Sequence, residues 1–102
     1  MVTSKPYTIQ IFNNSFDAEF LKEILILNQT NTPAVGHLNS LDELKELLNK
    51  SYINYFIKTN QIIGFMICFK EKSDYSSKNY KFFSDNEESF IYIDRVVIKE
   101  EY

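Results

Sequence analysis

Hydrophobic and polar positions in the first half of the chain predict one strand followed by two helices. Residues 7–12, "YTIQIF", alternate weakly and are rich in β-formers, which predicts a strand. Residues 16–28 carry apolar side chains at helical spacing, with a stripe wide enough to predict a broad buried face. A second helix is predicted after Ser40, because "SLDE" fits a capping box with Glu43 and leucines follow at helical spacing.

The second half of the chain predicts a β-hairpin. Residues 52–59 alternate, whereas residues 62–70 are apolar at nearly every position. Asn60 and Gln61 fit a two-residue turn between the two runs, so we expect an antiparallel pair. The doubly apolar run predicts a central strand covered on both faces, and Gly64 within it indicates a bulge or a close approach of another backbone.

A long segment, residues 71–89, separates the hairpin from the last strand. It shows no clear period, and connections of this length are uncommon in compact domains. The segment contains four aromatic residues, and a purely flexible loop has little use for them. We therefore expect it to pack on the rest of the domain or on a ligand.

The last strand, residues 90–98, reads "FIYIDRVVI" and is typical of a central strand. Regular alternation would place its side chains on two faces, namely Tyr92, Asp94, Val96 and Ile98 against Ile91, Ile93, Arg95 and Val97. Asp94 and Arg95 would then point in opposite directions and could not easily pair. Each charge therefore needs a partner on another element, or one of them belongs to a reaction site in which a carboxylate acts as base.

These elements predict the fold class. The expected order is β-α-α-β-β-β, an α+β fold with two helices on a mainly antiparallel sheet. The 102 residues suffice for a single domain, residues 1–102, and an apolar share of 44% allows a core to form.

Charge and cysteine content exclude several functions. The formal net charge is -3 and no basic block exists, so nucleic acid is not an expected partner. Cys68 is the single cysteine and lies in an apolar run, which predicts a small buried residue and excludes an internal disulfide.

His37 is the single histidine, so no metal site and no Cys/His pair are expected. No run approaches the roughly 20 apolar residues that span a bilayer, and we expect a soluble cytoplasmic protein without a membrane partner.

Four blocks, in one order, resemble the GNAT superfamily of acyl-CoA-dependent N-acyltransferases. They are "NQTNTPAVG", the "GF" of the hairpin, "DYSSKNYKFF" and "FIYIDRVVI". The resemblance covers roughly residues 27–102 and corresponds to the N-terminal half of the family fold. In that family a loop of the type Arg/Gln-x-x-Gly-x-Gly/Ala follows this strand and holds the CoA pyrophosphate at a helix N-terminus. The sequence ends before such a loop, so the resemblance implies an incomplete GNAT domain.

The resemblance also implies roles for particular residues. Acetyl-CoA would be the co-substrate, and its acyl and pantetheine groups would meet main-chain amides near Val96, Val97 and Ile98. Asp94 is the first candidate for the general base and Tyr92 the second. The acceptor, an amine of a small molecule or a protein, would lie between two walls, formed by Asn28, Pro33 and Val35 and by Tyr75, Asn79, Tyr80 and Phe82.

Two other functions stay open at this point. The chain could be a non-catalytic α+β binding module that uses its aromatic segment, or a truncated and inactive fragment. An unpaired strand edge also favours association, so a homodimer is one expected outcome.

Overall fold

The computed structural model describes residues 6–71, 73, 75, 80–82 and 89–100. Its elements follow the predicted order β-α-α-β-β-β. They are β1 (Thr8–Phe12), α1 (Ala18–Gln29), α2 (Leu41–Lys50), β2 (Ile53–Lys58), β3 (Ile62–Lys70) and β4 (Ile91–Ile98).

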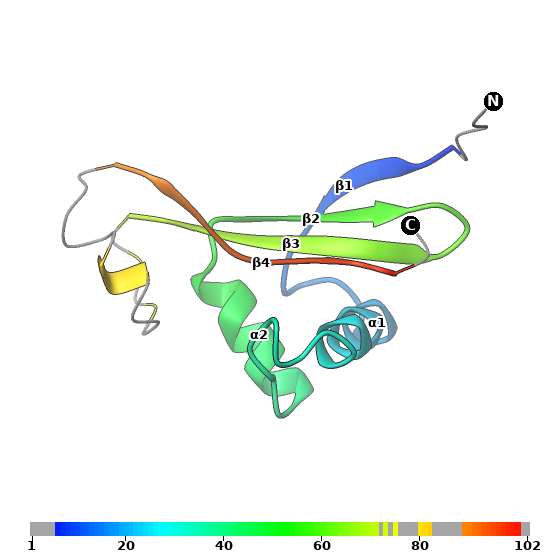
Figure 1. Cartoon of the computed structure of the whole chain (residues 1–102), viewed down its shortest axis with the longest axis horizontal. Helices are drawn as coiled ribbons and strands as arrows, with labels where there is room; N and C mark the ends of the chain where they lie inside the picture. The colour runs from blue at the N-terminus through cyan, green and yellow to red at the C-terminus, as the bar shows by residue number, and fades with distance from the viewer. Residues whose placement is uncertain (1–5, 72, 74, 76–79, 83–88, 101–102) are drawn as a thin grey trace.

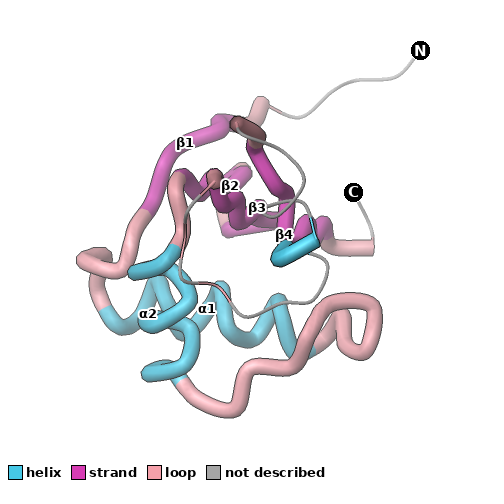
Figure 2. Tube along the Cα trace, turned by 90° about the vertical axis from the view of Figure 1, so that its left-hand side faces the viewer, coloured by secondary structure: helices cyan, strands magenta, loops and turns pink. Residues whose placement is uncertain are grey.

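The four strands form one sheet in the order β1-β2-β3-β4, and every neighbouring pair is antiparallel. Both helices lie on the same face of this sheet (Figures 1 and 2). The prediction that β3 is central is confirmed, because it pairs with β2 and with β4. Both helices lie on one side of the sheet, so no described helix covers the other face of β3, contrary to the prediction. The prediction of a central last strand is wrong for this sheet. No further strand pairs with β4 among the described residues, so β4 forms an edge.

The N-termini of both helices are capped by side chains. Asp17 caps α1, where its Oδ1 accepts a hydrogen bond from the Phe20 N–H at 2.8 Å. Ser40 caps α2 as predicted, and its hydroxyl accepts from the Glu43 N–H at 3.2 Å. The Glu43 carboxylate accepts from the N–H of Asn39 at 2.8 Å, one residue before the expected partner. Each cap satisfies a main-chain donor that the helix itself leaves free.

The hairpin contains a bulge at the glycine of β3. Its turn spans residues 59–61, one more than predicted, and the Thr59 N–H donates to the Gln61 carbonyl at 3.0 Å. The β2–β3 register shifts next to Gly64, as the sequence indicated. A Cβ atom at Gly64 would lie 2.5 Å from the carbonyl oxygen of Val97. Gly64 therefore allows β4 to approach β3 at this point.

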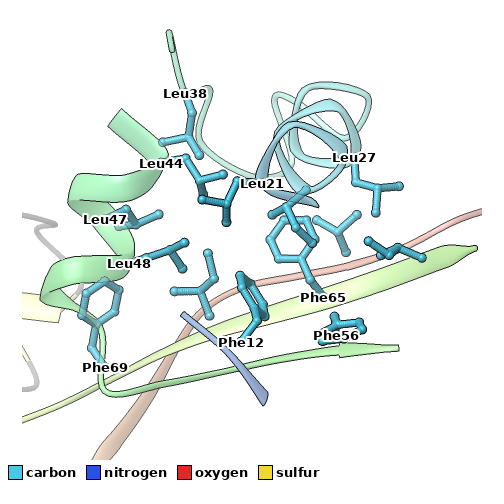
Figure 3. Packing of buried hydrophobic residues seen from close by; sticks show 14 of the residues in the cluster. Phe12, Leu21, Leu27, Leu38, Leu44, Leu47, Leu48, Phe56, Phe65 and Phe69 are labelled. Atoms are coloured by element: carbon cyan, nitrogen blue, oxygen red, sulfur yellow. The ribbon is translucent and has the colours of Figure 1, made fainter. Parts of the chain in front are cut away.

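The core lies between the sheet and the two helices. Side chains from α1, α2 and the inner face of the sheet meet there (Figure 3). Its buried members are Phe12, Leu21, Ile24, Leu27, Leu38, Leu44, Leu47, Leu48, Phe56, Ile62, Phe65, Ile67, Phe69, Tyr80 and Val97. Cys68 is also buried, and burial raises the pKa of its thiol, as expected of a residue that fills space and does not react.

Candidate functional site

A bulge in β4 places its two charged side chains. Ile67 of β3 pairs with Arg95, but the next residue, Cys68, pairs with Ile93, so Asp94 is the extra residue. A bulge of this kind interrupts the alternation of side chains along a strand. Arg95 and Val97 are consequently buried. The predicted division into two faces is therefore wrong, since the exposed positions are Ile91, Ile93, Val96 and Ile98 while Tyr92 and Asp94 are partly buried.

Asp94 and Arg95 form an ion pair, contrary to the prediction from regular alternation. The Arg95 Nε donates to the Asp94 Oδ2 at 2.7 Å, and the side chains of Arg95 and Asp94 are only 6% and 7% exposed, respectively. The bulge makes this contact possible because it brings two consecutive residues to one side of the strand. A buried ion pair also requires further hydrogen bonds to offset the cost of removing both charges from water.

Asn28 and Gly36 supply the further partners of the guanidinium. The Arg95 Nη1 donates to the Asn28 Oδ1 at 2.7 Å and to the Gly36 carbonyl at 2.9 Å. The Asn28 Nδ2 donates to the same carbonyl at 3.0 Å, and the Asn28 side chain is fully buried. These contacts tie β4 to the last turn of α1 and to the connection between the helices.

Tyr75, which lies in the long segment, is the last member of this arrangement. Its hydroxyl donates to the Asp94 Oδ1 at 2.5 Å, and its ring stacks on Phe69 with centroids 4.1 Å apart. Burial raises the pKa of Tyr75, the hydrogen bond to Asp94 and its charge raise it further, and Arg95 opposes the shift. Tyr75 is therefore a protonated donor near neutral pH. We refer to Asn28, Gly36, Tyr75, Asp94 and Arg95 as the polar cluster.

The other aromatic residues of the long segment divide between the core and the surface. The Tyr80 side chain is 1% exposed, and its hydroxyl donates to the Lys70 carbonyl and accepts from the Ser73 N–H. Tyr80 therefore packs into the core at the end of β3, in agreement with the prediction that the long segment packs on the rest of the domain or on a ligand. Phe82 is 63% exposed.

The remaining predicted site residues lie outside the polar cluster where the structure describes them. Pro33 is exposed and follows a cis peptide bond, whereas Val35 is half-buried against the core. Tyr92 is half-buried and packs its ring edge-on against Tyr80, with centroids 5.7 Å apart. Asn79 lies outside the described residues. The structure thus joins Asn28, Tyr75 and Asp94 from the predicted set in the polar cluster.

The free edge of β4 presents main-chain donors. The Lys99 N–H donates to the Ile63 carbonyl of β3 at 2.8 Å. Main-chain N–H groups alternate in direction along an antiparallel strand, so the Val97 N–H points towards β3 as the Lys99 N–H does. The N–H groups of Val96 and Ile98 consequently point to the edge that no described strand covers.

A groove lies between the end of β4 and the end of α1. Its volume is about 540 Å³, and it is lined by Ile26, Leu27, Thr30, Asn31, Ile98, Lys99 and Glu100. Leu27 and Thr30 flank the region where Asn28 enters the polar cluster. The polar cluster thus fixes one wall of this groove relative to the other.

Sequence reasoning missed the central position of Arg95 and the part played by the Gly36 carbonyl. The single arginine of the chain was a signal, because guanidinium groups satisfy several acceptors at once. A main-chain acceptor such as Gly36 leaves no signal in the sequence. No group of three or more potential metal ligands occurs in the described part of the chain.

The fold and the site define an α+β domain with a four-stranded antiparallel sheet, two helices on one face and a buried polar cluster on its edge strand. No family model, no curated protein and no solved structure matches the chain. None of the helices in the described ranges is long and apolar enough to cross a membrane.

Proposed function

We propose that this chain forms the acyl-binding part of a GNAT-type N-acyltransferase, which transfers an acetyl group from acetyl-CoA to an amine of a small molecule or a protein. The observation that carries the proposal is the bulged edge strand β4, reached after the order β-α-α-β-β-β. This is the strand on which the sequence resemblance places the acyl group. The free edge beside the bulge supports that placement.

The acyl group would bind through main-chain donors of β4. The N–H groups of Val96 and Ile98 face the free edge, whereas that of Val97 belongs to the ladder with β3. Two donors spaced along an edge can hold the thioester carbonyl and an amide of the pantetheine arm, much as an added strand is held. A donor at the carbonyl oxygen also stabilises the negative charge that develops there when an amine attacks.

The described residues fit only the acyl and pantetheine end of acetyl-CoA. The carbonyl of Gly36 already accepts from Arg95 and Asn28, and Gly64 lies in β3 paired with Ile98 of β4, where the Val97 carbonyl oxygen and the Ile98 side chain occupy the space next to it. Neither glycine belongs to a phosphate-binding loop. We therefore assign no role in phosphate binding to the described residues.

Asp94 is the candidate base in the reaction, with Tyr92 as the second. The amine nitrogen would form a bond with the thioester carbon, the carbon–sulfur bond would break, and the base would accept the amine proton. Asp94 already accepts hydrogen bonds from Tyr75 and Arg95, so it would act through its remaining lone pairs. The same contacts make Asp94 an anchor for the polar cluster, whichever residue takes the proton.

Calorimetric titration with three ligands tests the proposal. S-acetylpantetheine, acetyl-CoA and 3′,5′-ADP are each titrated into the 102-residue chain. We expect the two acetyl thioesters to bind weakly and alike, with Kd on the order of 1 mM, because the shared acetyl-pantetheine end makes the contacts. We expect no heat of binding from 3′,5′-ADP.

Two results would count against the proposal. Absence of binding by both thioesters would remove the acyl site from β4. Binding of 3′,5′-ADP as strong as that of acetyl-CoA would place the contacts on phosphate groups, which the described residues are not arranged to hold.

A further inference from the structure

The sheet face opposite the helices is apolar and uncovered in the described chain. Cross-strand pairing arranges its residues in three rows, Ile9–Ile57–Gly64–Ile98, Ile11–Tyr55–Met66–Val96 and Ile53–Cys68–Ile93. We call these residues the open sheet face. Both helices lie on the other side of the sheet (Figure 2). An antiparallel sheet with one solvated face normally carries polar side chains there, so this face is built to be covered.

The exposure of the open sheet face is large. On this face, six aliphatic residues of the edge strands β1 and β4 are between 40% and 58% exposed, namely Ile9, Ile11, Ile91, Ile93, Val96 and Ile98. The face also contains a shallow depression of about 430 Å³. Its lining includes Ile57, Met66 and Ile98. A protruding aliphatic side chain would fit such a depression.

Charge identifies the kind of partner. Among the described strand positions on this side of the sheet, the charged residue is Lys70, which lies at the end of β3 with its ammonium over the Tyr52 ring. The acidic excess of the chain therefore does not oppose contact between two copies through this face. An acidic peptide or an anionic membrane would find only the ammonium group of Lys70 to bind on this side of the sheet.

The extent of the open sheet face also suits a second copy. Its exposed apolar side chains lie on both edge strands, β1 and β4, so a contact through this face would cover all four strands of the sheet, and a stable interface buries roughly 800 Å² per partner. We propose that two copies of this chain pack through their open sheet faces as a two-fold symmetric dimer. Sheets packed face to face lie about 10 Å apart, with side chains interdigitated, which suits aliphatic rows flanking a depression. The contact uses side chains and leaves the β4 edge unpaired.

Sedimentation equilibrium of the wild-type chain and two variants tests the dimer. Ile11→Glu introduces a charge in the middle row of the open sheet face, at a side chain that is 56% exposed. Ile26→Glu makes the same change on α1, which lies on the other face of the sheet, at a side chain that is 63% exposed. We expect wild type and Ile26→Glu at twice 12.1 kDa and Ile11→Glu at 12.1 kDa, at protein concentrations of about 10 μM.

A second measurement does not depend on any variant. A mixture of ¹³C-labelled and unlabelled wild-type chain should give intermolecular NOEs between methyl groups of Ile9, Ile11 and Ile98. A wild-type mass of 12.1 kDa at all concentrations overturns the proposal and leaves this face to a different chain. A dimer that survives Ile11→Glu, or whose NOEs join only the β4 edges, also overturns it.

Discussion

Asp94 and Arg95, adjacent in the sequence, form a buried ion pair with 2.7 Å between the Arg95 Nε and the Asp94 Oδ2. The pair exists because Asp94 is the extra residue of a bulge in β4. Through Arg95, the strand holds the end of α1 at Asn28 and the helix connection at Gly36. The polar cluster therefore joins parts of the chain that are far apart in sequence.

Arg95→Met is expected to lower the free energy of unfolding by about 3–5 kcal/mol, because it leaves the Asp94 carboxylate buried and without its countercharge. Urea unfolding curves measure this change. Lys50→Met is the control, since Lys50 forms a partly exposed pair with Glu46 at 3.7 Å. The control should cost less than about 0.5 kcal/mol. Equal effects of the two substitutions would contradict a buried, structural ion pair.

The double variant Asp94→Asn/Arg95→Met is expected to be more stable than the sum of its single substitutions predicts. Each single substitution leaves one buried charge without its partner, whereas the double substitution removes both charges. The coupling free energy from a double-mutant cycle should be about 1–3 kcal/mol. Additive effects would show that the two side chains do not interact in solution.

Tyr75 is expected to contribute less to the stability of the fold as the pH rises into the alkaline range. Its pKa is raised in the folded chain above the ordinary value of 10.0, first by burial and then by Asp94. Below that ordinary value both states hold the phenolic proton and the contribution of Tyr75 is complete. Above it the unfolded state releases the proton while the folded state retains it, so the contribution declines as the pH rises. The stability difference between wild type and Tyr75→Phe should therefore shrink from pH 9 to pH 11, and a constant difference would argue against the buried hydrogen bond.

The two glycines are expected to differ sharply in their tolerance of a methyl group. Gly64→Ala would place a Cβ atom 2.5 Å from the Val97 carbonyl oxygen, so we expect a loss of about 1–3 kcal/mol or more. Gly36→Ala is the matched control. Its Cβ atom would meet the Arg95 Nη2 at 3.4 Å, and Gly36 has no positive φ. Chemical denaturation of both variants measures the difference, and a Gly64→Ala protein as stable as wild type would refute the close strand contact.

The elements of the fold could be predicted from the sequence because local signals specify them. The Ser40 cap, the leucine spacing of α2 and the doubly apolar run of β3 each depend on neighbouring residues alone. Gly64 was also informative, since a glycine inside a strand often marks a bulge or a close backbone contact, and both occur at this position.

The geometry of the site could not be predicted in the same way. The bulge at Asp94 arises from the register between β3 and β4, and nothing in residues 90–98 marks the extra residue. One inserted position reversed the faces of every residue after it. The partners of Arg95 are equally non-local, because Asn28 is 67 positions away in the sequence.

The most direct test of the proposed acyl site is the amide spectrum of β4 during titration with S-acetylpantetheine. ¹⁵N–¹H correlation spectra of the labelled chain report each main-chain N–H separately. We predict that the Val96 and Ile98 amides shift most, while the Val97 amide, held in the ladder with β3, changes little. Equal shifts along β4, or shifts confined to other elements, would contradict an acyl group bound at this edge.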